Sequence, residues 1–236
     1  MSVFFTRRGK APSLGKLASD YAVGESVFLM ENGTAVEYLV VNQGIPSGSS
    51  LYDSSCDGAW LLRKEIYESR AWDSDSYNDY EDSTIHTYLN GDFLALLGAD
   101  TQEKIKTVKL PYHRGAGDGG EVFSGSSGLS TQIFLLSVLE LGWTANSSDV
   151  PDDGAKLDYF ISGTTTSVNK KRIAYLNGTA TGWWLRSPYT NDTGFVWSCG
   201  QNGNCGKYNC SASRGIRPAL ILDASAKFDS DTNIIK

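Results

Sequence analysis

The segment GWWLRSP, residues 182–188, combines two tryptophans and a leucine with a closing proline. An apolar run of this length that stops at a proline is typical of a buried strand. FVWSC, residues 195–199, and IRPALIL, residues 216–222, have the same apolar character. Pro218 has no N–H to donate to a sheet, so its strand must place it at an edge or a bulge. We therefore expect an antiparallel set of three strands, with a Cys-, Asn-, Gly- and Ser-rich loop between two of them.

A hairpin is predicted near the N-terminus. ESVFLM, residues 25–30, and VEYLVV, residues 36–41, are apolar runs on either side of Asn32-Gly33. An Asn-Gly pair between two such runs is a strong signal for a two-residue hairpin turn. AWLLR, residues 59–63, is a further candidate for a buried strand.

The clearest helix signal lies in residues 84–98, TIHTYLNGDFLALLG, which carry an apolar stripe at helical spacing. Asp82 or Ser83 can cap the first turn, and Gly98 can end the helix. Gly91 weakens the middle of the segment, so we expect a break there.

Two further helices are expected. Asp100 and Glu103 have the spacing of a capping box for a helix in TQEKIKTV. QIFLLSVLELGW, residues 132–143, is interpreted as a strand followed by a helix that Gly142 ends. Residues 113–130 and 144–181 are expected to be mostly loop. The predicted class is therefore α+β, with a small twisted antiparallel sheet, two or three helices and long irregular loops.

The composition indicates one globular domain. Hydrophobic residues make up 40 % and charged residues 20 % of the 236 residues, which is ample for a core. We expect one ligand-binding domain at residues 21–236, after a tail at residues 1–20 that lacks the apolar region of a secretory signal. The tail is either solvated and partly mobile or attaches the domain to a larger assembly. A net charge of −6 does not favour nucleic acid, and no apolar run is long enough for membrane insertion.

No metal or cofactor site is predicted. The four cysteines are too few for a disulfide framework, and the spacings of Cys199, Cys205 and Cys210 match no common zinc motif. The acidic run at residues 72–83 begins with the acid spacing of a calcium loop but lacks its glycine and its final acid. We interpret this run as a polar loop that leads into a helix. The two histidines show no nucleophile–base motif, so no enzyme activity is predicted.

The stretch from Tyr189 to Ser213 has the composition of a recognition surface. Most of its residues are Asn, Gly, Ser, Cys or Tyr, and only Asp192 and Lys207 are charged. Tyrosine and tryptophan supply wide contact area, whereas Asn, Ser and Gly supply adaptable hydrogen bonds, as in antibody loops. Exposed aromatic rings also suit stacking on sugars. From composition alone, the alternative is an ordinary Gly/Asn-rich hairpin loop.

The genetic code adds a second observation on the same stretch. Replacing one or both adenines of the asparagine codons AAC and AAT yields Tyr, Ser, Cys, Gly, Asp, Thr, Ala and Phe, among others. Nearly every residue from 189 to 213 belongs to this set, and the exceptions are Trp197, Gln201 and Lys207. The three crowded cysteines would then be products of random diversification without a structural purpose.

Several motifs together resemble those of a domain family of gut bacteria and their phages. They are WWLRSP at residues 183–188 and GIRPAL at residues 215–220, with EYLVVNQG, CDGAWLLRKEIYESRAW, STIHTYLNGDFL and IFLLS upstream. Each motif is weak alone, but together they are specific and cover nearly the whole chain. The family is similar to the variable proteins of diversity-generating retroelements, which have a C-type-lectin-like fold. In those systems a reverse transcriptase copies a template with errors at adenines, and the copy replaces the C-terminal coding region of a receptor-binding protein.

The resemblance implies a C-type-lectin-like domain of a phage tail or bacterial cell surface that binds a protein or glycan receptor. The N-terminal segment would join it to the virion. The exchangeable, receptor-contacting residues that it implies are Tyr189, Asn191, Asp192, Phe195, Ser198, Cys199, Asn202, Asn204, Cys205, Tyr208, Asn209, Ser211 and Ser213. Trp197 and Lys207 complete this predicted surface. Replacing adenines in an asparagine codon cannot yield either residue.

A diversified surface must not carry the stability of the fold, because most core substitutions are destabilising. Trp183, Trp184, Arg186 and Arg217 are therefore expected to belong to a constant frame. The two arginines are candidates for buried side chains that brace irregular backbone through hydrogen bonds, and the alternative is an ordinary surface arginine.

Two other functions are compatible with parts of the sequence. Formylglycine-generating enzymes share the broad fold and bind copper through a cysteine pair, for which Cys205 and Cys210 would be the candidates. A constant carbohydrate-binding module would keep the aromatic residues and show no excess variation. Since a shared fold does not transfer function, we expect a ligand-binding protein without a cofactor rather than an enzyme.

Overall fold

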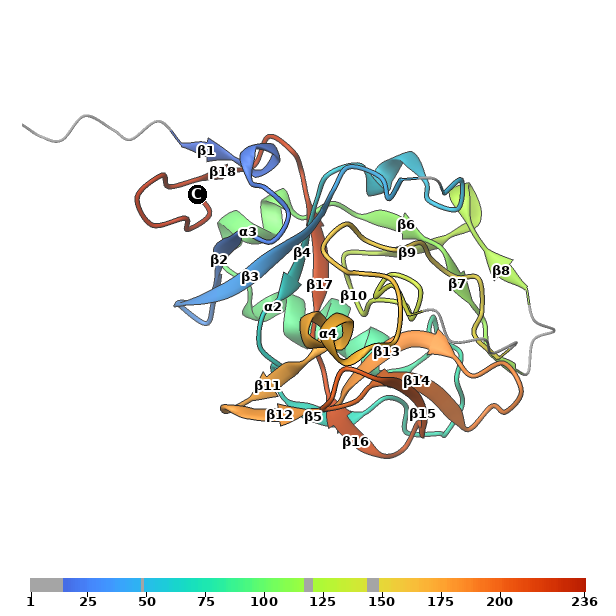
Figure 1. Cartoon of the computed structure of the whole chain (residues 1–236). Coiled ribbons are helices and arrows are strands. Elements are labelled where there is room, and N and C mark those ends of the chain that lie inside the picture. The colour runs from blue at the N-terminus through green and yellow to red at the C-terminus, as the bar shows by residue number, and fades with distance from the viewer. Residues whose placement is uncertain (1–14, 48, 117–120, 144–148) are drawn as a thin grey trace, which may run out of the picture.

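The computed structural model of the chain describes residues 15–47, 49–116, 121–143 and 149–236 (Figure 1). One five-stranded sheet has the order β10 (Ile133–Phe134), β17 (Ala219–Leu222), β4 (Ala59–Arg63), β3 (Thr34–Gln43) and β2 (Ser26–Glu31). The other has the order β15 (Cys205–Asn209), β14 (Phe195–Cys199), β13 (Trp183–Pro188), β16 (Ser213–Gly215) and β5 (Ser69–Ala71). The domain therefore has two sheets of equal strand number where the sequence predicts one small sheet.

Short strand pairs and short helices complete the α+β architecture. The pairs are β1 (Lys16–Leu17) with β18 (Lys227–Phe228), β6 (Val108–Leu110) with β9 (Leu129–Thr131), β7 (Tyr112–His113) with β8 (Val122–Phe123), and β11 (Ala174–Leu176) with β12 (Thr179–Thr181). The α-helices are α1 (Thr84–Tyr88), α2 (Leu94–Leu96), α3 (Ala99–Lys104) and α4 (Thr166–Asn169). Single 3-10 turns are η1 (Ala18–Asp20), η2 (Ser54–Cys56), η5 (Gly125–Ser127) and η6 (Lys170–Arg172), and η3 (Leu89–Phe93) is a π turn. The ranges 113–130 and 144–181 are mostly loop where the structure describes them, as expected, but they also hold these short strands and turns.

The β2–β3 hairpin is confirmed. Asn32 and Gly33 both have positive φ, 47° and 76°, which is the conformation of a two-residue turn between twisted strands. Strand β4 pairs with β3 along one edge and with β17 along the other, so it lies inside the sheet. Trp60 and Leu61 point to opposite faces and are both buried, so both faces of the sheet are covered here.

The three C-terminal strands do not form one antiparallel set. β13 and β14 lie in one sheet, whereas β17 lies between β10 and β4 in the other (Figure 1). The chain crosses between the sheets just after β16, which pairs in parallel with β13 through Gly215 and Trp183. Pro218 precedes β17, and its carbonyl accepts a hydrogen bond of 2.9 Å from Arg63 N. A strand can begin directly after a proline even at the centre of a sheet, so an edge position is not required here.

The Cys-, Asn-, Gly- and Ser-rich stretch is a hairpin rather than a loop. β14 and β15 pair in continuous register from Phe195 opposite Asn209 to Cys199 opposite Cys205. The polar, exposed residues of β15 hide the strand from pattern analysis, because an edge strand needs few apolar side chains.

The helical segment at 84–96 starts as predicted. The Oγ atom of Ser83 accepts a hydrogen bond of 3.2 Å from His86 N, which confirms Ser83 as the N-cap. Gly91 lies in the π turn η3, so the helix widens at this glycine and does not break.

The predicted capping box is wrong. α3 begins at Ala99 and its N-cap is Gly98, so Asp100 lies inside the first turn and Glu103 cannot complete a box with it. Gly98 is thus the N-cap of α3 and directly follows Leu97, the C-cap of α2.

The predicted helix after β10 is absent, and residues 138–142 form turns. Ser137 and Glu140 hold these turns through reciprocal bonds: Ser137 N donates to Glu140 Oε2 at 2.9 Å, and Glu140 N donates to Ser137 Oγ at 3.1 Å. Gly142 has a φ of 66°, which an L side chain rarely adopts. The apolar residues here reflect burial on all sides, since Leu136, Val138 and Leu141 are all inaccessible.

Part of the predicted tail belongs to the fold. β1 pairs with β18, and Ala18 and Tyr21 are buried. Residues 1–14, which hold most of the predicted attachment segment, lie outside the described residues. The packed domain therefore includes residues 16–20 as well as the predicted 21–236.

Candidate ligand-binding surface

The β14–β15 hairpin forms one edge of the second sheet. β15 pairs with β14, and no other described strand pairs with its outer side. Lys207, Tyr208 and Asn209 on β15 are exposed. Because side chains alternate along a strand, Lys207 and Tyr208 point to opposite faces of the sheet. The hairpin therefore presents two distinct faces to solvent.

The predicted contact residues divide into three groups by exposure. The exposed group consists of Asn191, Asp192, Asn202, Asn204, Lys207, Tyr208, Asn209, Ser211 and Ser213. The half-buried group consists of Tyr189, Phe195 and Cys205. The buried group consists of Trp197, Ser198 and Cys199. The placement of this last group on the exposed surface is wrong, because its side chains are buried.

On the first face, aromatic rings surround a lysine. The Nζ atom of Lys207 lies 4.0 Å from the ring centroid of Tyr189 and 5.3 Å from that of Phe195. The ring of Tyr189 also contacts the buried ring of Trp197, with centroids 6.1 Å apart. An ammonium group over aromatic rings is attracted to their faces, so this cluster is partly ordered before any ligand arrives.

On the second face, two arginines stack on two tyrosines. The guanidinium carbon of Arg214 lies 3.3 Å from the ring centroid of Tyr208, and that of Arg70 lies 3.3 Å from the ring of Tyr88. Arg70 and Arg214 are directly opposite each other in the β5–β16 pair. A Cβ atom at Gly182 would overlap the Nη1 atom of Arg214, so the glycine just before β13 leaves room for this arginine in the position where it stacks on Tyr208.

Several exposed polar side chains also shape the turns that carry them. Asp192, Asn202 and Asn209 each accept a hydrogen bond from the backbone N–H two residues later, at 2.9, 3.1 and 2.9 Å. This is the local bond by which Asn and Asp stabilise turns. The alternative of a Gly/Asn-rich hairpin therefore describes the structure of this stretch. The same exposed residues can still bind a ligand.

Asn78 anchors the turn between β13 and β14, and the sequence gives no indication of this role. Its Nδ2 group donates to the carbonyls of Tyr189, Asp192 and Phe195 at 3.0, 3.0 and 2.7 Å. Its Oδ1 atom accepts from Ala116 N at 3.1 Å. Asn78 itself is fully buried, so a residue outside the predicted surface fixes the path of that surface.

A second buried asparagine holds the tip of the β14–β15 hairpin. Asn169 donates a hydrogen bond from Nδ2 to Asn204 Oδ1. Gly203 packs against the backbone carbonyl of Asn169, where a Cβ atom would overlap the oxygen, and it has a φ of 76°. The hairpin tip therefore requires glycine at position 203 for two reasons, close approach and backbone conformation.

A buried ion pair lies beneath this surface. The Nη1 and Nη2 atoms of Arg186 each donate to a carboxylate oxygen of Glu140 at 2.6 Å, and both side chains are inaccessible to solvent. Tyr52 donates its hydroxyl proton to Glu140 Oε1 at 2.8 Å. Asp153 lies beside the pair and accepts a bond of 3.0 Å from Ser187 Oγ. Burial raises the pKa of Asp153 to about 7, although the charge of Arg186 opposes the change.

The other frame residues are also buried. Trp183 Nε1 donates to Arg172 O and Trp184 Nε1 donates to Arg70 O, both at 2.9 Å. Arg217 Nε donates to a backbone carbonyl at 2.9 Å, and burial lowers the pKa of this guanidinium to about 10. Arg186 and Arg217 are therefore both buried, as expected for a bracing arginine and not for an ordinary surface arginine.

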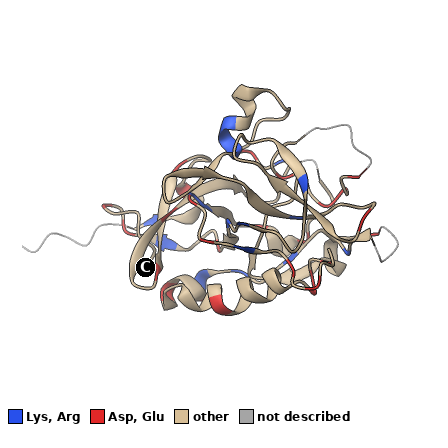
Figure 2. Cartoon of the chain, turned by 90° about the horizontal axis from the view of Figure 1, so that it is seen from below, with Lys and Arg blue, Asp and Glu red and all other residues tan. Residues whose placement is uncertain are grey.

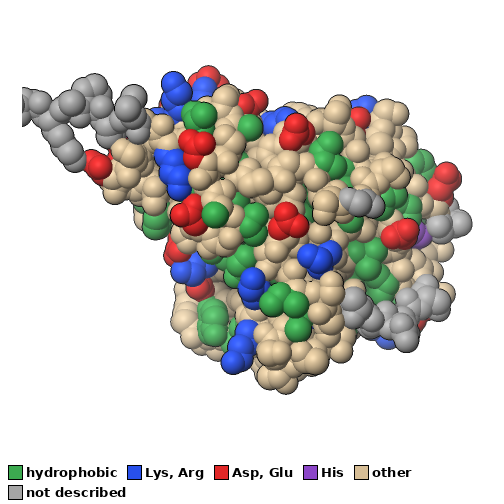
Figure 3. Space-filling model, turned by 45° about the horizontal axis from the view of Figure 1, so that its top comes forward, with side chains coloured by type: hydrophobic (Ala, Val, Ile, Leu, Met, Phe, Trp, Pro, Cys, Tyr) green, Lys and Arg blue, Asp and Glu red, His purple; other side chains and the backbone are tan. Residues whose placement is uncertain are grey.

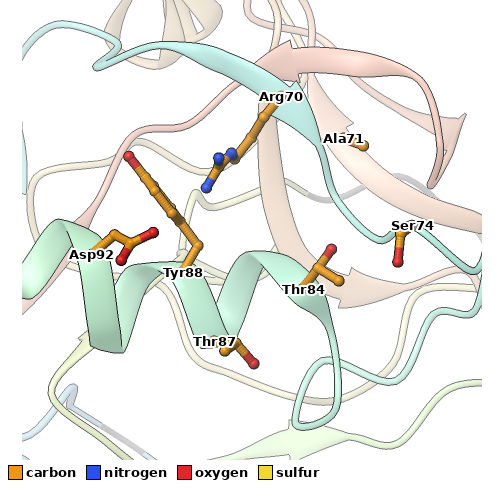
Figure 4. Close-up of a pocket in the computed structure, with 7 residues that line it drawn as sticks. All are labelled: Arg70, Ala71, Ser74, Thr84, Thr87, Tyr88 and Asp92. Carbon is orange, nitrogen blue, oxygen red and sulfur yellow. The ribbon is translucent and has the colours of Figure 1, made fainter.

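A hollow of about 460 Å³ opens at the other edge of the second sheet, between β5 and the α1–η3 segment (Figure 4). Its lining includes Arg70, Ser74, Thr84, Thr87, Tyr88 and Asp92. Arg70, Tyr88 and Asp92 point toward one another in Figure 4. This volume lies within the range of small-molecule sites.

The cysteines do not support a copper site. Cys205 begins β15 and Cys210 follows its last residue, and a strand rises about 3.3 Å per residue, so one metal ion cannot contact both. Cys199 and Cys210 are buried, which contradicts the interpretation of all three cysteines as exposed, exchangeable residues. Across the described ranges, no group of three or more His, Cys, Asp or Glu side chains is placed to hold a metal ion. The Asp73 carboxylate instead accepts hydrogen bonds from the backbone of Asp75, Tyr77 and Thr84.

Charges of both signs are mixed over the molecule. Lys and Arg lie among Asp and Glu in the ribbon view of Figure 2, and the same mixture covers the face shown in Figure 3. No described helix has the length and apolar character that crossing a bilayer requires.

Comparison with known proteins identifies a family. The family model described as a domain of unknown function, DUF6273, matches residues 57–224. No curated protein and no solved structure matches the chain. The matched segment contains β4, all five strands of the second sheet, including the β14–β15 hairpin, and β17. Since it covers well over half of the 236 residues, the chain belongs to the DUF6273 family.

Proposed function

We propose that this chain is a ligand-binding protein whose C-terminal hairpin surface is diversified by a retroelement. In this proposal the domain is C-type-lectin-like, its partner is a protein or glycan receptor, and it acts at a phage tail or bacterial cell surface. The observation that carries the proposal is the position of the exposed, asparagine-derivable residues. They lie on an edge hairpin and its turns, whereas most core residues lie outside residues 189–213, and within that stretch the core residues Val196, Trp197, Cys199 and Cys210 are buried.

The separation has an energetic basis. Substitutions at exposed positions usually change stability by no more than about 0.5 kcal/mol, whereas those in a core cost much more. Nine of the predicted contact residues are exposed, so their replacement leaves the two hydrophobic clusters intact. Asn78 holds the turn between β13 and β14 from outside the stretch, through bonds to backbone carbonyls that do not depend on the side chains of residues 189–195. The backbone of this turn can therefore persist while its side chains change.

The first experiment is deep sequencing of this gene and its flanking DNA in the population of origin. We expect substitutions to concentrate at the exposed codons between 189 and 213, at adenines of a nearby near-repeat. Trp197 and Gly203 should stay constant, because the first is buried and the second has a positive φ and no room for a Cβ atom. Variation no greater than at codons 25–110 would overturn diversification and favour the alternative, a constant carbohydrate-binding module.

A binding assay complements the sequencing. Two natural variants that differ only at exposed codons should have the same thermal midpoint within about 2 °C but bind different receptors. Equal binding of both variants to the same receptor would show that the hairpin does not determine specificity.

A further inference from the structure

We propose that the hollow between β5 and the α1–η3 segment is a fixed subsite for a neutral, hydroxyl-rich sugar unit. This inference rests on the proposed ligand-binding role but not on diversification. The hollow combines a guanidinium group, a carboxylate, three hydroxyl side chains and one aromatic ring within about 460 Å³. A small number of convergent polar groups in a concave site is the usual composition of a small-molecule site.

The arginine of the hollow is held in place before a ligand binds. Arg70 stacks on the ring of Tyr88, and its Nε atom lies 3.3 Å from Glu68 Oε1. Stacking covers one face of the guanidinium group of Arg70. The N–H groups lie in the guanidinium plane, so they point away from the Tyr88 ring. No described residue accepts a hydrogen bond from the Nη groups of Arg70, so these donors remain for a ligand. A donor fixed in this way loses little freedom on binding.

The acceptors of the hollow are also unused by the protein. Among the described residues, none makes a hydrogen bond or ion pair with the Asp92 carboxylate or the Thr87 hydroxyl. Asp92 points toward Arg70 and Tyr88 in Figure 4. A sugar diol both donates and accepts hydrogen bonds, so it matches a carboxylate on one side and guanidinium N–H groups on the other.

The charges disfavour an anionic ligand. Glu68 already balances the charge of Arg70, so the unpaired charge at the hollow is the negative carboxylate of Asp92. An anionic sugar would be repelled by this carboxylate. The hydroxyls of Ser74, Thr84 and Thr87 add neutral partners.

The hollow also adjoins the proposed diversified surface. Ala71, which lies at its rim, is directly opposite Ser213 in the β5–β16 pair. Arg70 is opposite Arg214, which stacks on Tyr208. A glycan held at the hollow by one sugar would thus reach exchangeable residues with its next units, so one fixed contact would serve many receptors.

The test is saturation-transfer NMR of the full chain with methyl glycosides of glucose, galactose, mannose and fucose, and with N-acetylneuraminic acid. We expect at least one neutral glycoside to bind and the acidic sugar not to bind. Asp92→Ala and Thr87→Ala should weaken binding, the former by about tenfold or more because it removes a charged hydrogen-bonding group. Asp100→Ala is the matched control, since Asp100 is an exposed acid on α3 outside the hollow.

The outcomes separate the subsite from the proposed function. No binding of any neutral glycoside, or unchanged binding by Asp92→Ala, would overturn the subsite. Loss of binding only with Tyr208→Ala or Ser213→Ala would do the same while supporting the hairpin surface. Binding that depends on Asp92 together with invariant codons at 189–213 would support the subsite and contradict diversification.

A second inference rests on a different observation, the register of the β14–β15 hairpin. Cys199 and Cys205 are directly opposite each other. Gly200 N donates to Asn204 O at 2.7 Å, so the next pair inward, Cys199 and Cys205, is a non-hydrogen-bonded pair. Cα atoms in such pairs are about 4.5 Å apart, within the range that a disulfide spans.

We infer that Cys199 and Cys205 form a disulfide across the hairpin when the protein meets a small-molecule disulfide such as oxidised glutathione. The half-buried Cys205 thiolate attacks the small disulfide and releases one thiol. Cys199 then loses its proton, displaces the second thiol and closes the protein disulfide. Two protein thiols are oxidised and one small disulfide is reduced to two thiols. The bond would fix the short tip that carries Asn202 and Asn204.

The other two cysteines provide the control. Cys56 and Cys210 are buried and sit on other segments, so neither faces a cysteine across a strand pair. The test is exposure of the folded chain to oxidised glutathione, alkylation under denaturing conditions and peptide mass spectrometry. We expect a 199–205 cross-link and two free thiols per chain, with a rise of about 5 °C or more in the thermal midpoint. Cys205→Ser should abolish both changes and Cys210→Ser neither. Four free thiols in the wild-type chain, or a link to Cys210, would overturn the inference.

Discussion

The buried pair of Arg186 and Glu140 provides the sharpest test of the idea that a constant frame carries the stability. In Arg186→Met the carboxylate of Glu140 loses both of its guanidinium bonds, each 2.6 Å long, and stays inaccessible to solvent. Removing one partner of a buried pair costs about 3–5 kcal/mol. A domain of this size has about 5–15 kcal/mol of stability in total, so one substitution removes a large part of it.

The assay is urea unfolding followed by tryptophan fluorescence, applied to a double-mutant cycle of Arg186→Met and Glu140→Gln. Because each single change leaves one charge without its partner, the double variant should lose less than the sum of the two single losses. The difference should lie between about 0.5 and 3 kcal/mol. If a single variant does not fold, limited proteolysis of the single and double variants makes the same comparison.

The control is Tyr208→Ser on the exposed edge strand, where only a surface cation–π contact is lost. We expect a cost of no more than about 1 kcal/mol. A loss below about 1 kcal/mol for Arg186→Met, or additive single changes, would refute the reasoning about the buried pair. A loss for Tyr208→Ser as large as that for Arg186→Met would refute the division into frame and surface.

Three further predictions concern the frame and its contacts with the surface. The pKa of Asp153 is about 7 in the folded state and about 4 in the unfolded chain. As pH rises, Asp153 therefore loses its proton in the unfolded chain before it does in the folded protein. The free energy of unfolding should fall between about pH 4 and 7, by roughly 4 kcal/mol in all. Asp153→Asn should flatten this slope in unfolding curves at several pH values, and an unchanged slope would contradict it. Gly182→Ala should displace Arg214 and lower stability by about 1–3 kcal/mol in urea, and a cost below about 0.5 kcal/mol would show that the arginine has another path. Asn78→Ala should speed amide hydrogen exchange at residues 189–195, because three carbonyl anchors are lost, with exchange in β2 as the unchanged reference.

Local chemistry explains which parts of the fold were predictable. The turn at Asn32-Gly33 and the cap at Ser83 depend on a few neighbouring residues, and the structure shows both. The apolar strands were found because burial on two faces requires continuous apolar residues. The sheet to which β17 belongs was predicted incorrectly, since strand partners are chosen by contacts distant in sequence.

The errors at the candidate site have a similar cause. Asn78 and Asn169 look like ordinary loop residues, and only their burial shows that they hold the turns. The apolar period at 135–142 resembles that of a helix, but Glu140 is drawn inward by Arg186, whose partner no local pattern reveals. Codon reachability predicts that Cys199 is exchangeable, but codons carry no information on burial, and Cys199 is buried where β14 packs in the sheet.

The unpaired side of β15 limits how far such a hairpin can vary. An open strand edge offers its backbone N–H and C=O groups to any other extended chain, and charged residues on the edge are a common protection against aggregation. Here Lys207 is the charged residue on that strand, and Gly206 beside it offers little apolar surface. A lineage that replaced its β15 residues with valine, isoleucine or phenylalanine would gain contact area and also a tendency to form intermolecular sheets. The number of β15 sequences that stay soluble is therefore smaller than the number that the codons can produce. Variants must first remain soluble before their affinity for a receptor can be selected.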